Sequence, residues 1–409
     1  MRRAPLVPSL AAILATGAAG ALAACGGDDT STGTPDAAAT VDAAPAPDAN
    51  PCPRAAAPAD RARKVVVSLP YDAGGGQAST WTVLDLAADG TPSGPTGAPF
   101  TMGRATRGAI AFTPDGEVGL VAQDDGSLGV FRFDGDTPVV VHARFTGSFY
   151  AERVVVDPAG DLAYVIDPNW RNNGGGIYRV AIGCDGSLTD LGLWFPTKLA
   201  AGLHLRGERA VLVATDVGDS PAGDTVDLLD WTTEPPGLLD GDPLFPDDQA
   251  IVAATAMTAN GRHVLVGDNS EFSGLPNRVA VAAVAGDAVT TTQVITPVED
   301  PVAIVASPFD DAALVVSGYG DAVFVLDYAP DAATPFTLRG EVAYAGAAPQ
   351  LPGDAVMIER GGQRGLVLIA ELAGVRRMRF GAGATVTDLG LQSTGTGYTA
   401  ITGAIGVQP

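Results

Sequence analysis

The fold is decided by a short repeat whose clearest copy reads Gly108-Ala-Ile-Ala-Phe-Thr-Pro-Asp-Gly116. This apolar run enters a tight turn, and a second apolar run, Val118-Gly-Leu-Val-Ala122, follows it. A third run from Ser127 to Phe133 and a fourth from Pro138 to Phe145 complete the unit. Four short β-rich runs within about 40 residues predict the four antiparallel strands of one propeller blade.

The same unit recurs along the chain at intervals of about 44 to 54 residues. Matching positions in the turn before the second strand carry Gly116, Gly160, Gly207, Gly261, Asp310 and Gly362. Six copies are complete between residues 104 and 398. Loops of variable length on a constant framework explain the uneven spacing, and no long segment with a helical period interrupts the repeats.

The two ends of this region supply a seventh copy. Residues 65–69 match a second strand and residues 80–86 match a third, but the first strand of this copy is missing there. It is found at the other end, where Gly403-Ala-Ile-Gly-Val-Gln-Pro409 parallels residues 108–114. The expected fold is therefore all-β, a seven-bladed β-propeller closed by pairing of the C-terminal strand with the N-terminal blade. Such closure leaves no open sheet edge.

Parts of the repeat resemble a known family. Thr113-Pro-Asp-Gly-Glu-Val-Gly-Leu-Val and Asp157-Pro-Ala-Gly-Asp-Leu-Ala-Tyr-Val are similar to the repeats of lactonase-like (YVTN-type) seven-bladed propellers. Cys184-Asp-Gly-Ser-Leu188 is similar to that family's turn between the third and fourth strands. The resemblance implies the same architecture over the whole body. Hydrolytic members of the family use His, Arg and acidic side chains that line the channel, and no residue-by-residue counterpart of that set is found here.

The N-terminal residues predict export. Arg2 and Arg3 precede an Ala-rich apolar stretch, which is short and broken by glycine and ends in Leu22-Ala-Ala-Cys25. This ending resembles the lipobox of bacterial lipoproteins, which implies cleavage before Cys25 and its diacylation. An ordinary signal peptide with an incidental cysteine is the alternative. The expected domains are a lipoprotein signal peptide at 1–24, a lipid-anchored disordered tether at 25–62 and the propeller at 63–409.

The expected location is the cell envelope. Gly26 stands where a lipoprotein retained in the inner membrane often has Asp, so the outer membrane is the favoured site and the membrane is a partner through the N-terminal lipid. The net charge of −23 repels phosphate backbones and excludes nucleic acid as a partner. We expect a monomer.

The two remaining cysteines predict a disulfide. With Cys25 lipidated, Cys52 and Cys184 are an even pair in an oxidising compartment. Cys184 lies in a turn between third and fourth strands, on the face where the first strand after the tether begins. The residues between Cys52 and Lys64 are numerous enough to reach that turn.

The default ligand site of a propeller is a mouth of its central channel, and loops from second to third strands surround one mouth. The candidate ligand residues are Asp124, Asp167, Asn169, Trp170, Arg171, Asp268 and Tyr319 on those loops, with His204 on an inner strand. Trp170 and Arg171 could stack on a ligand and hydrogen-bond to it, although a solvated loop is the plainer interpretation. His204 could act as a base or ligand contact, with a structural histidine as the alternative.

No metal ligand, cofactor or catalytic residue is assigned. His-x-x-His spacing and Asp-x-Asp-x-Asp-Gly loops are absent, although the acidic mouth leaves Ca²⁺ conceivable, and no Gly-x-Ser-x-Gly motif occurs. The leading hypothesis is a non-catalytic propeller that binds a protein or a small molecule. The alternatives are a lactonase-like hydrolase using channel residues such as Arg171 and His204, and a scaffold subunit of an envelope complex. An enzyme would bring an acid or base and an arginine together in the channel.

Overall fold

The computed structural model describes a propeller body that begins at Cys52. The described residues are 52, 54–105, 110–169, 174–197, 199–214, 225–245, 252–269, 277–296, 298–395, 399 and 403–409. Cys25, Trp170 and Arg171 lie outside them. In the described part of the chain, no helix has the length and apolarity needed to cross a bilayer.

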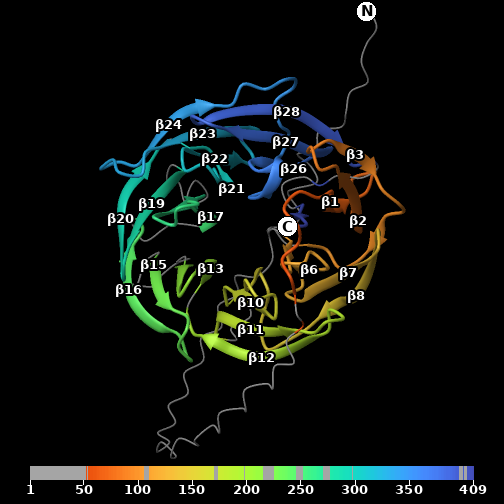
Figure 1. The fold of residues 1–409 in the computed structure, drawn as a ribbon, viewed down its shortest axis with the longest axis horizontal. Coiled ribbons are helices and arrows are strands. Elements are labelled where there is room, and N and C mark those ends of the chain that lie inside the picture. Colours follow the sequence, from red (N-terminus) through yellow and green to blue (C-terminus); the bar gives the residue numbers. More distant parts are fainter. Residues whose placement is uncertain are drawn as a thin grey trace, which may run out of the picture. The chain divides into compact units, whose positions relative to one another are not determined.

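The described strands form seven sheets arranged in a ring, so the predicted seven-bladed β-propeller is confirmed (Figure 1). Blade 1 consists of β29 (Ile405–Val407), β1 (Arg63–Tyr71), β2 (Gln77–Leu86) and β3 (Pro92–Pro95), and β4 (Phe100–Thr101) also pairs with β2. Blade 2 consists of β5 (Ala111–Phe112), β6 (Val118–Ala122), β7 (Leu128–Asp134) and β8 (Thr137–Phe145). Blade 3 consists of β9 (Arg153–Val156), β10 (Leu162–Asp167), β11 (Gly176–Ile182) and β12 (Leu188–Phe195).

The other four blades follow the same order from the inner to the outer strand. Blades 4 and 5 consist of β13 (Ala200–Arg206), β14 (Arg209–Ala214), β15 (Thr225–Asp230) and β16 (Gly237–Pro243); and β17 (Val252–Met257), β18 (His263–Asp268), β19 (Arg278–Ala285) and β20 (Ala288–Ile295). Blades 6 and 7 consist of β21 (Pro301–Ala306), β22 (Ala312–Ser317), β23 (Ala322–Tyr328) and β24 (Phe336–Glu341); and β25 (Ala355–Met357), β26 (Leu366–Glu371), β27 (Gly374–Gly381) and β28 (Thr385–Ser393).

The ring closes as the sequence predicts. β29 pairs with β1 in antiparallel register, with Val65 opposite Val407 and Val67 opposite Ile405. The Gln408 side chain extends this seam, because its Oε1 accepts the Lys64 N–H at 3.0 Å and its Nε2 donates to the Gly116 carbonyl at 2.7 Å. The last strand thus binds the first blade and also touches the second.

The core lies between neighbouring blades. One cluster joins Tyr164 and Trp194 of blade 3 to Leu203 and Leu212 of blade 4, and similar clusters recur around the ring. Alternation along each strand explains this packing, since successive side chains point to opposite faces of a blade and second strands such as β6, β18, β22 and β26 are buried along their whole length.

The turns between first and second strands share one face of the ring with the turns between third and fourth strands, because all strands in a blade are antiparallel. We call this the turn face. Five of the six repeated turn positions have positive φ, as at Gly160 (82°) and at Asp310 (56°), which is the conformation that glycine adopts without strain. In blade 7 the positive φ lies one residue earlier than the expected Gly362, at Gly361 (76°). A short 3₁₀ helix, η4 (Gly361–Gln363), lies in the corresponding turn of blade 7.

Candidate functional site

The acidic residues of the predicted mouth hold loops in place. Asp167 is fully buried, and its two carboxylate oxygens accept the N–H groups of Tyr150 at 2.8 Å and Asn169 at 2.7 Å. Asp268 is equally buried and pairs with Arg278, with 2.7 Å between its Oδ2 and the arginine Nε. Carboxylates at the ends of second strands therefore fasten the connections between and within blades.

The remaining described residues of that mouth are nearer to solvent. Asp124 pairs with Arg104 at 3.3 Å. Asn169 adopts a φ of 68° and its side chain accepts the Gly174 N–H at 3.2 Å. Tyr319 is 47% exposed. A role of these residues in ligand binding stays a prediction.

A cavity of about 760 Å³ occupies the channel at the turn face, which is the opposite end from the predicted mouth. The inner strands β9, β13, β17, β21 and β25 contribute its walls, and apolar atoms come from residues such as Leu203, Ile304 and Met357. His204 lines this cavity. Among the described residues proposed from the sequence, it is the one that the structure places there.

His204 is held as a neutral imidazole. Its Nε2 lies 3.1 Å from the Thr255 hydroxyl oxygen on the neighbouring inner strand. Burial in the channel, reinforced by the positive charge of Arg153, lowers the pKa of His204 to about 4. Arg153 reaches past β13 and donates to the Ala253 carbonyl on β17. A cation and an unprotonated base therefore lie close together in the channel.

Gly202 makes this arrangement possible. A Cβ atom at Gly202 would lie 2.4 Å from the Thr255 hydroxyl oxygen, closer than side-chain atoms approach one another. The missing side chain thus leaves Thr255 the room in which it contacts His204.

The mouth of the cavity is rich in arginine. Arg206 and Arg364 lie over neighbouring turns, where Arg206 donates to the Ala259 carbonyl at 2.7 Å and Arg364 lies over the Phe309 ring at 4.8 Å. Arg360 is exposed, and no hydrogen bond or ion pair joins it to the described residues. Glu359 is the one acidic residue among the residues that line this cavity.

A segment between Cys52 and β1 borders the same mouth, and we call residues 54–62 the strap. Figure 1 shows it in orange, crossing the inner ends of blades 3, 2 and 1 beside the C-terminus. A second cavity of about 450 Å³ lies between the strap and the channel wall. Ala56 of the strap lines it, and it shares Glu359 and Arg360 with the channel cavity.

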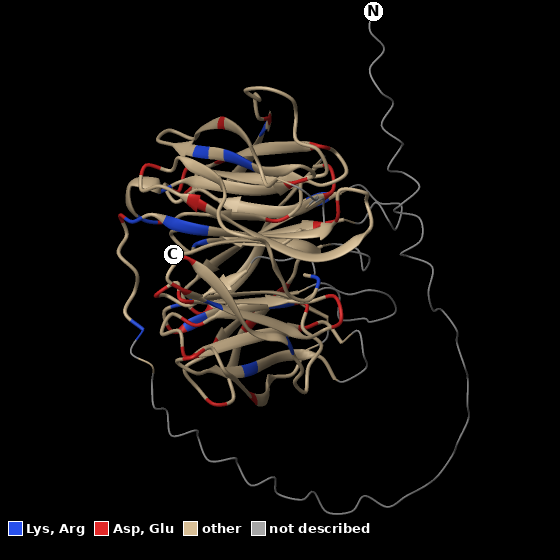
Figure 2. Ribbon diagram, turned by 90° about the vertical axis from the view of Figure 1, so that its right-hand side faces the viewer, with Lys and Arg blue, Asp and Glu red and all other residues tan. Residues whose placement is uncertain are grey.

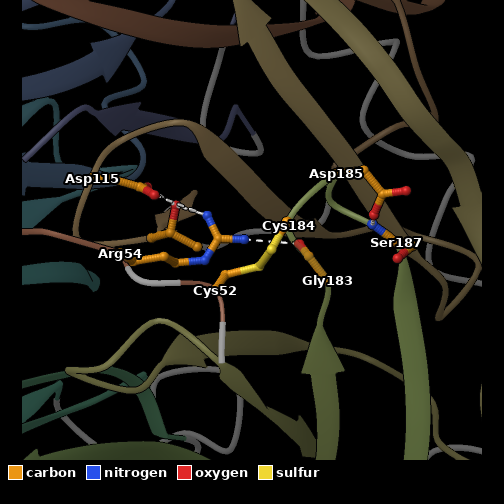
Figure 3. Close-up of a disulfide and its surroundings, with 8 residues drawn as sticks. Cys52, Arg54, Asp115, Gly183, Cys184, Asp185 and Ser187 are labelled. Atoms are coloured by element: carbon orange, nitrogen blue, oxygen red, sulfur yellow. Dashed lines mark hydrogen bonds and ion pairs between the residues drawn. A yellow bond between two sulfur atoms is a disulfide. The ribbon is translucent and has the colours of Figure 1, made fainter. Parts of the chain in front are cut away.

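The strap is fixed at its beginning by the predicted disulfide, which the structure contains. Cys52 and Cys184 are bonded, with their Cα atoms 5.3 Å apart (Figure 3). Arg54 lies beside the disulfide, with its side chain 2% exposed, and pairs with Asp115 at 3.0 Å. Its other terminal nitrogen donates to the Gly183 carbonyl at 2.8 Å.

The strap is fixed at its end by Arg63, which is 2% exposed. The Arg63 guanidinium donates to the Gln363 side chain at 2.6 Å and to the Ala59 carbonyl at 2.7 Å. Burial lowers the pKa of Arg63, and the positive charges of Arg61 and Arg360 lower it further. Like charges therefore gather at this edge of the mouth.

A third cavity, of about 830 Å³, is a groove between blades 1 and 2 on the turn face. Its central cation, Lys64, bridges Asp85 at 2.5 Å and Asp136 at 2.7 Å. The charges in this groove satisfy one another, so it offers a ligand fewer unpaired groups than the channel mouth does.

The described residues form no candidate metal site, and His263 makes a structural contact. Within the described ranges, no three His, Cys, Asp or Glu side chains are grouped closely enough to hold a metal ion. His263 is buried, and its Nδ1 lies 2.8 Å from the Tyr328 hydroxyl oxygen, which is a structural contact between blades 5 and 6.

The arginines of the mouth were missed in the sequence because they are far apart in it. Arg206 lies in blade 4, Arg360 and Arg364 in blade 7, and Arg63 at the start of blade 1. Arg206, Arg360 and Arg364 all stand in or beside a turn between a first and a second strand. Superposing the repeats at the turn glycine would have placed these three on one face.

Comparison with protein-family models and with curated protein sequences gave no match. Solved structures do match. One is a protein of Bacteroides fragilis described as a candidate 6-phosphogluconolactonase, with a TM-score of 0.55 and 12% identity over 85% of this chain and 98% of that one. Another is the periplasmic gluconolactonase of Pseudomonas aeruginosa, with a TM-score of 0.53 and 15% identity over 83% and 99%.

A functionally unknown protein of Desulfotomaculum acetoxidans is similar to the same degree, with a TM-score of 0.53 and 12% identity over 84% of this chain and 98% of that one. At such identities the likeness concerns architecture alone. This chain is a seven-bladed β-propeller with the same architecture as gluconolactonase-like propellers.

Proposed function

We propose that this protein is an exported, lipid-anchored propeller that binds a small anionic ligand in the channel cavity at the turn face. The observation that carries the proposal is the charge of the lining. Arg206, Arg360 and Arg364 face one glutamate around a cavity of about 760 Å³, in a chain whose net charge is −23. Figure 2 shows Asp and Glu residues spread over both faces of the ring. A local basic mouth in an acidic protein attracts and retains anions.

The chemistry of the wall indicates what else the ligand carries. His204 as a neutral imidazole offers a hydrogen-bonding group, and Leu205 and Ile304 offer apolar contact. A compact molecule with several hydroxyl groups and one carboxylate or phosphate, such as a sugar acid, suits such a lining.

Binding is favoured over catalysis by the pKa of His204. A general base works best when its pKa lies near the operating pH, and a pKa of about 4 makes His204 a weak base at neutral pH. The imidazole is therefore suited to accept or donate a hydrogen bond to a bound ligand without removing a proton from water.

A lactonase-like hydrolase is the second candidate. Its support is that Arg153 lies near enough to His204 for its charge to lower the pKa of the imidazole, since a hydrolase would need a base and a cation in the same channel. Two proteins of the same architecture are a candidate 6-phosphogluconolactonase and a gluconolactonase. In this candidate His204 would orient the attacking water and Arg153 would stabilise the oxyanion.

The test is calorimetric titration of the full-length protein with gluconate and with 6-phosphogluconate at low and high salt. We expect binding that weakens with salt, and we expect Arg360→Gln to lower the affinity by at least about fivefold. Arg339→Gln is the matched control, because Arg339 pairs with Asp327 on the outer strands of blade 6. Absence of binding at millimolar ligand, or equal loss in both variants, would overturn the proposal.

The hydrolase candidate has its own assay. Opening of glucono-1,5-lactone and its 6-phosphate is followed above the spontaneous rate, with His204→Gln as the variant. Turnover that His204→Gln abolishes would favour the enzyme, and a rate equal to the spontaneous one would leave binding alone.

Export and anchoring are proposed from Leu22-Ala-Ala-Cys25. A disulfide at Cys52 and Cys184 supports an oxidising compartment. Metabolic labelling with an alkyne-bearing fatty acid should mark the wild-type protein and leave Cys25→Ser unmarked. Affinity capture from membranes would reveal a protein partner if the propeller serves as a scaffold.

A further inference from the structure

We propose that the strap is a movable wall of the channel mouth and that the Cys52–Cys184 disulfide is its latch. Cleavage of this disulfide by a dithiol releases the strap and opens the cavity. The proposal rests on the binding function proposed above for the same cavity. Three features of the structure lead to it: the position of the strap, its uneven attachment and the exposure of Cys184.

The position of the strap makes it part of the mouth. Ala56 lies across the 450 Å³ cavity from Met357 and Arg360 of blade 7. Met357, Glu359 and Arg360 line that cavity and the channel cavity alike, so the two spaces meet at this rim. Displacing the strap would remove the wall on the side of Ala56 and would leave a wider entrance.

The attachment of the strap is uneven along its length. Its C-terminal end is held by Arg63 on the Ala59 carbonyl and by Asp60, whose carboxylate accepts the Gly362 N–H at 2.6 Å. That end continues directly into β1, which is paired on both edges. It is therefore suited to act as a hinge.

The N-terminal half depends mainly on one side chain. Arg54 donates to the Asp115 carboxylate at 3.0 Å, to the Gly183 carbonyl at 2.8 Å and to the Thr113 hydroxyl at 3.5 Å, and the Ala57 N–H donates to the Pro114 carbonyl at 2.9 Å. Ala55, Ala56 and Pro58 are exposed. Because ordering a backbone segment is costly in entropy, the covalent bond at Cys52 beside Arg54 decides whether this half stays in place.

The latch is open to attack from one side. Cys184 is exposed, whereas Cys52 is 8% exposed. The thiolate of an external dithiol can therefore attack the Cys184 Sγ, which forms a mixed disulfide and expels Cys52 as a thiolate. The second thiol of the reductant then attacks its own sulfur in the mixed disulfide. The products are two cysteine thiols, which take up the two protons of the dithiol, and the cyclic oxidised reductant.

The experiment measures access to the channel without any ligand. Full-length protein carrying Cys25→Ser and Ala306→Cys has its one free thiol in the channel, because Ala306 lines the cavity and is 7% exposed. Its labelling by a bulky maleimide is compared with and without Cys52→Ser and Cys184→Ser. Ala288→Cys is the matched control, since Ala288 is exposed on the outer strand β20.

We expect loss of the latch to raise the labelling rate at residue 306 by at least about tenfold and to leave the rate at residue 288 within about twofold. Hydrogen exchange should rise at Ala57 and stay slow at Gln408, whose N–H donates to the Lys64 carbonyl. Unchanged labelling at residue 306, or an Ala57 amide that stays protected, would overturn the proposal.

A second route covers the case in which the double serine variant does not fold. The disulfide-bonded protein is then folded first and reduced with a phosphine, and the same two rates are measured. The readout separates the two proposals, because faster labelling without binding of gluconate or 6-phosphogluconate refutes the ligand and keeps the latch. Binding of gluconate or 6-phosphogluconate with unchanged labelling keeps the proposed ligand and refutes the latch.

Discussion

Replacement of Ile405 by alanine tests whether the last strand closes the ring. Ile405 is fully buried, pairs with Val67 in β1, and packs in one cluster with Leu84 of blade 1 and Leu368 of blade 7. Its carbonyl also accepts the Ile110 N–H of blade 2 at 3.0 Å. The Ile405 side chain thus joins blades 1 and 7, and its backbone carbonyl adds a contact to blade 2.

The magnitude follows from the side chain that is lost. Three buried carbons at about 0.8 kcal/mol each give about 2.4 kcal/mol of transfer free energy. The cavity left behind adds about 1 to 2 kcal/mol, because the strands of blades 1 and 7 that surround it cannot move far enough to fill it. The sum is about 4 kcal/mol. With an unfolding entropy of about 0.7 kcal/mol/K for a body of roughly 350 residues, Tm should fall by about 5 °C.

The assay is thermal unfolding by differential scanning calorimetry, with urea unfolding as a second measurement. Val294→Ala is the control, because Val294 is 41% exposed on the outer strand β20, and its Tm should change by less than about 1 °C. Hydrogen exchange at Ser68, whose N–H donates to the Ala404 carbonyl at 2.9 Å, should rise in Ile405→Ala. A fall in Tm no greater than that of the control would refute the closure argument.

Three further predictions concern charge and covalent structure. The pKa of His204 is about 4 in the folded protein and ordinary when unfolded, so the unfolded state binds more protons between these values and stability is lost as the pH falls. Between pH 7 and pH 4.5, the free energy of unfolding in urea should fall by about 2 to 3 kcal/mol less in His204→Gln than in the wild type, and an equal loss would contradict this. Arg376→Met leaves two buried carboxylates without their cation and should lower the free energy of unfolding, measured in urea, by about 3 to 5 kcal/mol. Arg339→Gln, at an exposed position, should lower it by less than about 0.5 kcal/mol. Replacing Cys52 and Cys184 by serine opens a loop with a sequence separation of 132, which lowers the free energy of unfolding by at most about 5 kcal/mol and Tm by at most about 7 °C. We expect a fall in Tm well below this limit, because a strap released in the native state gains conformational entropy there too.

The channel mouth and the strap together suggest how one architecture can serve different tasks. The propeller body supplies a rigid ring, whereas the charge of the turn face depends on a few arginines in exposed turns. Such turns tolerate substitution without disturbing the blades, because the core lies between the sheets. The proposed ligand site therefore depends on residues that contribute little to folding.

Local features of the sequence were enough to predict the blades, the closure and the disulfide. A strand of alternating side chains and a turn that requires positive φ are set by neighbouring residues, so the repeat at Gly116, Gly160 and Asp310 predicts the strands that the structure contains. The match between residues 403–409 and residues 108–114 required no knowledge of packing, since a strand missing at one end and present at the other has one place to pair.

The site depended on tertiary structure. Asp167 and Asp268 resemble solvated loop residues in the sequence, and burial alone shows that each holds the structure together. Net charge is a sum over the chain, whereas the potential in a cavity depends on which charges converge there, and Arg206 and Arg360 converge only because the ring brings blades 4 and 7 to one opening. The sequence by itself therefore determined the architecture, and the folded ring decided which charges line the channel cavity.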